Sequence, residues 1–241
     1  MRFGVFSDIH ANLEALTAIL EDLSKRSVDT YVCAGDLVGY GADPSPCIKT
    51  VREVDPIIVC GNHDRAACGL LSTENFNAQA REAALWTKRT ITSSESEYLT
   101  GLEFIREGRG FTLVHGSLVD PEFFEYIVSG FEASATIRRM KNSVCFVAHT
   151  HVPGVFYMSD GRARFARDPL ITLRPDEKYI VNSGSVGQPR DGNNKAAYAV
   201  FDDSAMTVEI RRVRYDIDTA KKKILRAGLP AILAVRLSEG R

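Results

Sequence analysis

Two short segments of this 241-residue chain place metal-binding side chains at alternate positions. One residue separates Asp8 from His10, and one residue separates His149 from His151. In extended backbone, residues at i and i+2 point to the same face, so each pair could direct both side chains toward one ion. Carboxylate and imidazole groups together suit divalent Mn, Fe, Zn, Ni or Co. The spacing therefore indicates a transition-metal site.

All five histidines of the chain lie in short polar segments that follow apolar, strand-like runs. A single histidine in such a place is more often a satisfied core or surface residue, but coincidence is a poor explanation for five. With neighbouring Asp and Asn residues, these segments supply seven candidate ligands: Asp8, His10, Asp36, Asn62, His115, His149 and His151. Because seven ligands exceed what one tetrahedral ion needs, we expect two ions that share a carboxylate.

The strands that precede these segments must bring them to one place. Strand-like runs at 2–7, 28–34 and 56–60 alternate with helical patterns at 12–26 and 44–54. This order predicts parallel strands joined by crossover helices. Since open α/β sheets carry their sites at the carboxyl ends of strands, we expect the polar segments to meet at one edge.

The remainder of the chain is richer in short strands. Helices are expected at 75–89 and 216–225, and the stretch 229–235 is interpreted as a C-terminal packing segment. Further strands, several of them separated by turn residues, are expected at 111–115, 144–148, 155–158, 162–166, 179–181, 197–201 and 206–213. With no visible repeat or linker, we expect one domain over residues 1–241 that contains two sheets.

Composition argues against several classes of partner. The formal net charge is -1, so no basic excess points to long nucleic acid or to a membrane surface. The first apolar run is shorter than the core of a signal peptide. The five cysteines show no CxxC spacing, which disfavours a disulfide framework or a zinc ribbon and favours free thiols. We expect a cytoplasmic protein, with the oligomeric state left open.

Taken in order, the polar segments resemble the motifs of calcineurin-like metallophosphoesterases. They read Asp8-x-His10, Gly35-Asp36, Gly61-Asn62-His63-Asp64, His115-Gly116 and Ala148-His149-Thr150-His151. The stretches 35–41 and 182–191 are similar to loops of the small bacterial and archaeal members. Ala148 stands where the family usually has Gly, and Ser183 where it usually has Pro. The resemblance covers most of the chain.

The resemblance implies an α/β fold, a four-layer α-β-β-α sandwich with two mixed β-sheets. It also implies a hydrolase that cleaves phosphoester bonds with two divalent ions. The implied ligands are Asp8, His10 and His151 for one ion, Asn62, His115 and His149 for the other, and Asp36 as the bridge. A hydroxide that bridges the ions would attack phosphorus.

The resemblance gives His63 and Asp64 catalytic rather than ligating roles. His63 would protonate the leaving alkoxide, and Asp64 would orient its imidazole. Arg65 and Arg190 are weaker candidates for contact with the phosphate, because surface arginines are the commoner case. Tyr40 either lines the pocket or packs in a turn.

Three other interpretations are weighed. A non-catalytic metal-binding interaction protein on the same fold is the first alternative, but such a protein would be expected to lose ligands or His63. A metallo-β-lactamase-like hydrolase would carry an HxHxDH cluster, which is absent. A nucleic-acid enzyme acting on long polymers is disfavoured by the charge. The expected substrate is a small phosphoester, with cyclic nucleotides, dinucleotides, phosphomonoesters, phosphoproteins and small phosphodiesters all open.

Overall fold

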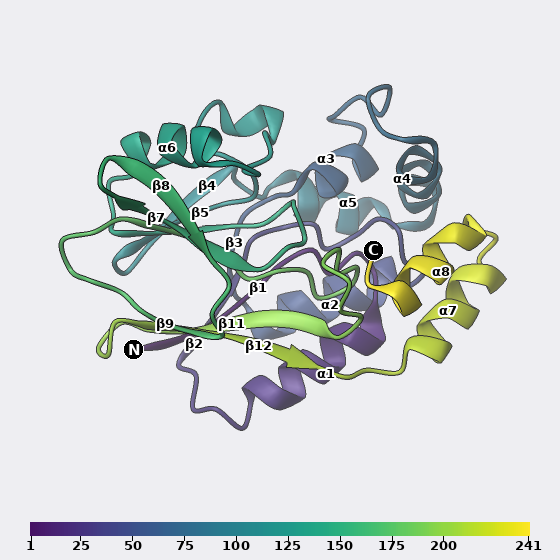
Figure 1. The fold of residues 1–241 in the computed structure, drawn as a ribbon. Helices are drawn as coiled ribbons and strands as arrows, with labels where there is room; N and C mark the ends of the chain where they lie inside the picture. Colours follow the sequence, from purple (N-terminus) through teal and green to yellow (C-terminus); the bar gives the residue numbers. More distant parts are fainter.

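Two β-sheets face each other, and helices cover the outer face of each (Figure 1). The computed structural model describes residues 1–241. Both sheets have six strands and mix parallel with antiparallel pairs. The predicted four-layer sandwich with two mixed sheets is therefore confirmed.

The first sheet has the order β3-β2-β1-β11-β12-β9. Its strands are β1 (Arg2–Phe6), β2 (Thr30–Cys33), β3 (Ile57–Ile58), β9 (Leu170–Thr172), β11 (Ala196–Asp202) and β12 (Thr207–Val213). β2 pairs in parallel with β1 and with β3, as the early β-α-β-α-β pattern predicts. β11 pairs antiparallel with β1, so a late segment completes the sheet that the first residues begin.

The second sheet has the order β4-β5-β6-β10-β7-β8. Its strands are β4 (Ile105–Gly108), β5 (Phe111–Val114), β6 (Val144–Val147), β7 (Gly154–Ser159), β8 (Arg162–Ala166) and β10 (Tyr179–Asn182). β6 lies between β5 and β10 and is parallel to both. β5 and β6 therefore direct their carboxyl ends to the same edge.

The core between the sheets is aromatic at its centre. Phe3 and Phe201 from the first sheet meet Phe111 and Phe146 from the second, and all four are buried. The ring centroids of Phe3 and Phe111 lie 5.3 Å apart, and those of Phe146 and Phe201 lie 5.6 Å apart. Such edge-to-face contacts lock the two sheets together and fix the relative positions of their strand ends.

Helices bury the other face of each sheet. α1 (Leu13–Leu23), α2 (Pro44–Val54) and α5 (Ser93–Thr100) share a core with the first sheet, whereas α6 (Gly130–Arg139) packs on the second. Asn12 caps α1 as expected, since its side chain accepts a hydrogen bond from the Ala15 amide at 3.1 Å. Strands that are covered on both faces explain the continuous apolar runs of the sequence.

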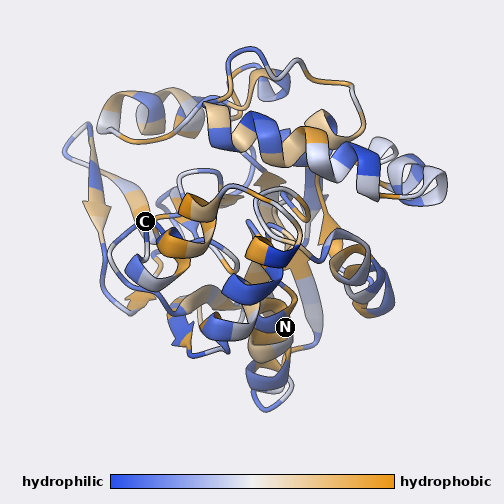
Figure 2. Cartoon of the chain, turned by 90° about the vertical axis from the view of Figure 1, so that its right-hand side faces the viewer, coloured by the Kyte–Doolittle hydropathy of each residue, from blue (hydrophilic) through white to orange (hydrophobic).

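A further group of helices lies beyond the edge of the sheets. α4 (Ala78–Thr90), α7 (Ile217–Arg226) and α8 (Ala231–Glu239) bury a shared cluster that includes Tyr40. Figure 2 looks onto this end of the molecule, where the helices near the C-terminus carry hydrophilic and hydrophobic residues along their length. No helix of the chain is long and apolar enough to cross a membrane.

Several elements were not expected from the sequence. They are α3 (Asn62–Ala67), α5, α6, α8, the single 3₁₀ turn η1 (Pro121–Phe123), and the short strands β4 and β9. The stretch 229–235, interpreted as a packing segment, contains the start of α8. The reason differs between the segments: in α5 only Leu99 is buried, whereas α3 is buried but only six residues long and mainly polar. Tertiary contacts rather than an apolar stripe stabilise them.

Candidate metal centre

The polar segments at five strand ends converge on one site. β1 leads to Asp8 and His10, β2 leads to Asp36, and β3 leads through a short turn to Asn62. In the second sheet β5 leads to His115, and β6 leads to the segment of His149 and His151. All seven of these side chains are buried. The edge predicted from the strand order is therefore where the candidate ligands meet.

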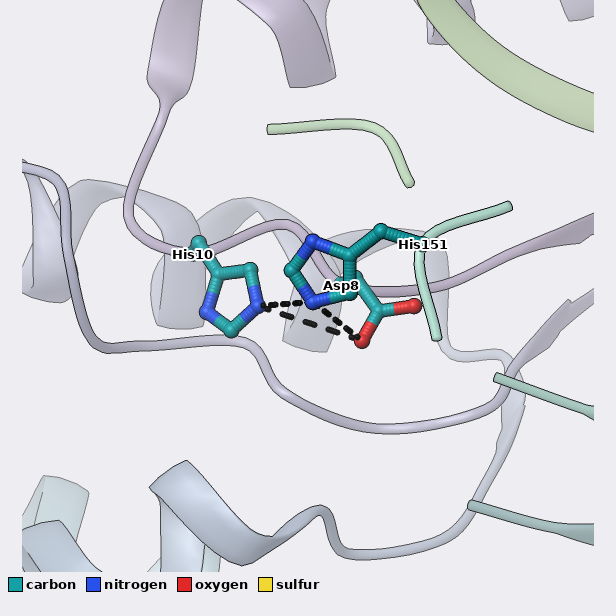
Figure 3. Close-up of side chains that lie close together, drawn as sticks. All are labelled: Asp8, His10 and His151. Carbon is teal, nitrogen blue, oxygen red and sulfur yellow. Dashed lines mark hydrogen bonds and ion pairs between the residues drawn. The ribbon is translucent and has the colours of Figure 1, made fainter. Parts of the chain in front are cut away.

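Asp8, His10 and His151 form the first cluster (Figure 3). Nε2 of His10 lies 3.1 Å from Nε2 of His151. Oδ1 of Asp8 lies 3.8 Å from the His10 nitrogen and 3.4 Å from the His151 nitrogen. The three atoms surround one point, as ligands of a single ion would.

Backbone carbonyls decide which nitrogen of each imidazole is free. Nδ1 of His10 donates to the Val38 carbonyl at 3.1 Å, and Nδ1 of His151 donates to the Gln188 carbonyl at 2.5 Å. Because a carbonyl can only accept, each neutral ring keeps its proton on Nδ1 and a lone pair on Nε2. Both lone pairs therefore face the same point, an arrangement typical of metal-binding histidines.

His115, Asn62 and His149 form the second cluster. Nε2 of His115 lies 3.2 Å from Oδ1 of Asn62 and 3.2 Å from Nδ1 of His149. Its other nitrogen, Nδ1, donates to the Ala34 carbonyl at 2.6 Å. This ring too turns its Nε2 toward the centre of the site.

Asp36 lies between the two clusters. Its Oδ2 is 3.6 Å from Nε2 of His10 and 3.4 Å from Nε2 of His115. Its other oxygen, Oδ1, accepts a hydrogen bond from the His63 amide at 2.8 Å, which fixes the orientation of the carboxylate. One oxygen is therefore within reach of both groups of nitrogen ligands.

The donor set fits divalent ions. Oδ1 of Asp8 and Oδ2 of Asp36 are buried and have no hydrogen-bond partner in the protein. An unpartnered buried carboxylate oxygen is costly unless a cation compensates it. Here two such oxygens lie close to imidazole nitrogens and an amide oxygen, which are ligand atoms that suit borderline transition metals. The residues that the sequence indicated therefore form sites with the chemistry of divalent-metal centres.

The backbone at the ligands is not extended as the i, i+2 spacing suggested. Asp8, His10, Asp36, His149 and His151 all have positive φ, between 49° and 68°. These left-handed conformations are unfavourable for residues other than glycine and gather at functional sites. They turn His149 toward the second cluster and His151 toward the first. The two side chains of this pair therefore face different clusters, which is the division that the family resemblance implied and that extended backbone would not give.

In the metal-free protein, burial and neighbouring charges shift the pKa values of the candidate ligands. Burial raises the pKa of Asp8 to about 7. Burial also disfavours the charged form of His115, but the nearby Asp36 carboxylate outweighs it and raises the pKa of His115 to about 9. Burial, followed by the positive charge of Arg190, lowers the pKa of His151. Protons and metal ions therefore compete for the same oxygen and nitrogen atoms.

Asp64 has different partners from those expected. Its carboxylate accepts hydrogen bonds from the amides of Asp36, Leu37 and Gly61 at 2.8–2.9 Å and from that of Val38 at 3.3 Å. The expected contact with the His63 ring is not formed, and Nδ1 of His63 is buried without a partner. Both oxygens of the Asp64 carboxylate are occupied by hydrogen bonds from the turn amides, and the His63 ring is not among their partners. It orders the backbone that carries Asp36 and His63.

Two glycines allow the loops of the site to approach closely. A Cβ atom at Gly61 would lie 2.0 Å from Oδ1 of Asp36, and one at Gly39 would lie 2.5 Å from Nδ1 of His63. Gly39 also has a positive φ of 93°. Gly61 thus leaves room for the Asp36 carboxylate, and Gly39 leaves room for the His63 ring.

The late loop braces the first metal-binding segment. Ser185 donates from its hydroxyl to the Asp8 carbonyl at 2.8 Å, and the Gly187 amide donates to the same carbonyl at 2.9 Å. Ser183 is buried with its hydroxyl 3.5 Å from that of Ser7, which donates to Oδ2 of Asp8 at 2.8 Å. Ala148 is also buried. Neither departure from the family motif removes a ligand.

Of the weaker candidates for contact with the substrate, Arg190 and Tyr40 lie next to the metal centre and Arg65 does not. Arg190 donates to the Tyr40 hydroxyl at 3.2 Å, and the Tyr40 ring packs against the rings of His10 and His63 at 4.6 and 4.4 Å. Arg65 lies over the Phe104 ring, 4.9 Å from its centroid, and belongs to the surface around α3. Arg190 and Tyr40 are therefore part of the site's surroundings.

Sequence reasoning missed two groups of contributors. The carbonyls of Ala34, Val38 and Gln188 orient three imidazoles, but any residue type supplies a carbonyl, so the sequence carries no signal for them. Phe76 and Tyr126 pack against histidines of the site with centroid distances of 5.1 and 3.8 Å. Only tertiary structure brings these aromatic residues to the metal centre.

Two mixed sheets with clustered Asp, Asn and His ligands at their strand ends define the architecture of a metallophosphoesterase. The sequence from residue 1 to 205 matches the calcineurin-like phosphoesterase superfamily domain. The chain therefore belongs to the calcineurin-like phosphoesterase superfamily, and the resemblance found in the motifs is confirmed.

Relatives extend this match over the whole chain. An uncharacterized protein of Methanocaldococcus jannaschii is 39% identical over 242 residues, which cover 99% of this chain and 98% of the relative. The crystal structure of a metallophosphoesterase from Sphaerobacter thermophilus has a TM-score of 0.89 at 38% identity, covering 100% of this chain and 99% of that one. A hypothetical protein from Pyrococcus horikoshii OT3, 19% identical, shares the fold with a TM-score of 0.82, covering 100% and 98% of the two chains.

Proposed function

We propose that this protein is a hydrolase that cleaves phosphoester bonds with two divalent ions. The observation that carries the proposal is the position of Asp36 Oδ2, an unpartnered buried oxygen close to nitrogen ligands of both clusters. A carboxylate in this place suits a bridge between two ions. Membership of the phosphoesterase superfamily supports phosphoester bonds as the target.

The seven candidate ligands divide between two positions. Asp8, His10 and His151 would hold one ion, Asn62, His115 and His149 would hold the other, and Asp36 would contribute to both. Mn, Fe, Zn, Ni and Co all suit this mixture of nitrogen and oxygen donors. When bound, the ions neutralise phosphate charge and make hydroxide available near neutral pH.

His63 is proposed as the proton donor to the leaving alkoxide. One of its ring nitrogens lies within 4.8 Å of ligand atoms of His10 and Asp36, so the ring reaches the centre of the site. Burial lowers the pKa of His63 to about 4 in the protein alone. The negative charge of a bound phosphoester raises the pKa of a neighbouring imidazole and so favours the charged, acidic form. Protonation of the leaving group by such an acid contributes roughly 10²–10⁴-fold.

Arg190 is proposed to contact the substrate phosphate. Its Nη2 is held by the Tyr40 hydroxyl and by Oε1 of Gln188 at 3.1 Å, while its Nε is buried without a partner. A guanidinium with free donors next to a metal centre can bind a phosphate oxygen. The rigid partners keep its side chain in place before substrate arrives.

The proposal is tested by hydrolysis assays on protein reconstituted separately with each metal. Phosphomonoesters and phosphodiesters are compared, with release of the alcohol as the measurement. Asp36→Asn is the matched variant, because it keeps the shape of the side chain and removes the charge at the bridge. We expect turnover in at least one substrate class by the reconstituted protein and strong loss in the variant. Absence of turnover with every metal, or equal turnover by the variant, would contradict the proposal.

A further inference from the structure

A cavity of about 410 Å³ opens directly beside the metal centre. Asn62, His63 and His149 form the part of its wall that belongs to the site. This volume lies within the range of roughly 300–1,000 Å³ that is usual for small-molecule sites. Because His63 lines the cavity, the group whose oxygen it would protonate must extend into this space.

Aromatic rings line the cavity next to the site. The Phe76 ring lies 5.1 Å from the His63 ring, and the Tyr126 ring stacks on His149 at 3.8 Å with an interplanar angle of 18°. Tyr126 is 46% exposed and its neighbour Phe123 is 70% exposed. Exposed aromatic side chains at the mouth of a cavity offer flat apolar faces to a ligand.

The backbone of the loop that carries Phe123 and Tyr126 is strained. Phe124 has a positive φ of 54°, an unfavourable conformation for a bulky residue. Gly116, the residue after His115, lies under this turn, because a Cβ atom there would come within 2.8 Å of the Phe124 backbone. The loop is therefore tied to the metal-binding segment, and such strain is typical of ligand-binding segments.

The polar residues of the cavity are neutral or acidic. Asn75 and Glu125 are exposed at its wall and can form hydrogen bonds with a ligand, and no Lys or Arg lines it. Without a cation, the cavity has no partner for a second phosphate group. Its occupant must therefore carry no further negative charge, and the aromatic rings favour one that combines a flat aromatic face with polar edges. A nucleobase has these properties, since every base stacks on aromatic residues and offers donors and acceptors at its edge.

We propose that this aromatic cavity binds the base of a nucleoside that forms the leaving side of the substrate. The substrate class is thereby a nucleoside phosphoester with one phosphate at the metal centre. This inference rests on the proposed hydrolase function and specifies its substrate.

The first experiment compares substrates that differ only in the base. Adenosine 5′-monophosphate is paired with ribose 5-phosphate, and the methyl diester of each forms a second pair. Within a pair the leaving alkoxide is nearly the same, so the ratio of the two kcat/KM values measures the contribution of the base. Stacking of a base predicts a preference of roughly 10–100-fold for the nucleoside ester. Equal kcat/KM values within both pairs would overturn the inference and leave the hydrolase function intact.

Two variants test the rings themselves. Phe76→Leu and Tyr126→Leu keep apolar volume and remove the aromatic face, so each should lower the nucleoside-to-ribose ratio severalfold. Phe131→Leu is the control, because Phe131 is 80% exposed on α6 and does not line the cavity. An unchanged ratio in both cavity variants would contradict the proposal.

A binding measurement separates failure of this inference from failure of the proposed function. Calorimetry compares adenosine with ribose on metal-loaded protein in the absence of turnover. Adenosine binding that is weakened by Phe76→Leu or Tyr126→Leu supports the cavity even where no ester is hydrolysed. Absence of adenosine binding would overturn the inference, whether or not an ester is hydrolysed.

Discussion

Nε2 of His10 and Nε2 of His151 lie 3.1 Å apart, although the two residues are 141 positions apart in the chain. Each ring donates from Nδ1 to a backbone carbonyl, so both Nε2 atoms present lone pairs. Two lone pairs at this distance repel each other unless a cation or a proton lies between them. Bound ions would therefore stabilise this arrangement of the two histidine rings.

Divalent ions are accordingly expected to stabilise the fold. Ions that bind the native site and not the unfolded chain add about 2.7 kcal/mol at a concentration 100 times the Kd. Thermal unfolding of chelator-treated protein, with and without Mn²⁺ or Zn²⁺, measures this as a rise in Tm. Asp36→Asn should show a smaller rise. A Tm that no divalent ion changes would argue against a metal centre.

Removal of the bridging ligand should differ from removal of a terminal one. Asp36→Ala should lower occupancy at both positions, because its Oδ2 is close to nitrogen ligands of both clusters. His10→Ala should affect mainly the position it shares with Asp8 and His151. Elemental analysis after reconstitution, relative to two ions per chain in the unaltered protein, measures the difference. Loss of one ion in both variants would contradict the assignment of Asp36 as the bridge.

Metal affinity should rise with pH. In the protein alone the pKa of Asp8 is about 7 and that of His115 is about 9, so an ion displaces a proton from His115 below pH 9 and from Asp8 below pH 7. Each displaced proton weakens apparent affinity roughly tenfold per pH unit as the pH falls. Titrations at several pH values, with proton release followed in weak buffer, check the slope. Affinity that does not change from pH 6 to pH 9 would refute the prediction.

His63→Ala should separate proton donation from metal binding. If His63 acts only as the acid, the variant keeps both ions and loses roughly 10²–10⁴-fold in turnover of esters with poor leaving groups. The loss should shrink for a nitrophenyl ester, since its leaving group departs without a proton. His115→Ala, which removes a candidate ligand, is the comparison and should impair both kinds of ester. Loss of metal from His63→Ala would instead make this residue a ligand.

Arg190→Ala should weaken substrate binding without releasing the ions. Its guanidinium has a buried donor without a partner beside the site, and it contacts Tyr40 and Gln188 rather than any of the seven candidate ligands. Loss of a charged hydrogen bond of about 1.5–3 kcal/mol corresponds to roughly 10–150-fold in kcat/KM. Arg65→Ala is the matched control, because Arg65 packs on Phe104 instead. Equal kinetic effects in the two variants would show that Arg190 has no special role.

Much of this protein could be predicted from its sequence because apolar periodicity and strand-end polarity are local signals. Spacing within a few residues was enough to predict the parallel strands at the start of the chain. It also predicted the bounds of α2, Pro44–Val54, and of β8, Arg162–Ala166. The seven candidate ligands were also identified from the sequence, and all of them lie within the residues that match the superfamily domain. The helix α5 was not predicted because only Leu99 of its eight residues is buried, so it has no apolar stripe.

Tertiary structure alone decided how the candidate ligands are oriented and which backbone groups hold them. His149 and His151 are neighbours in sequence, but positive φ angles direct them to different clusters. Asp64 binds turn amides instead of the His63 ring, because the folded turn places those amides nearer to it. Backbone carbonyls that set the imidazole tautomers, and aromatic rings that line the cavity, come from distant segments. Such contacts depend on how the two sheets pack, and no local pattern of residues encodes them.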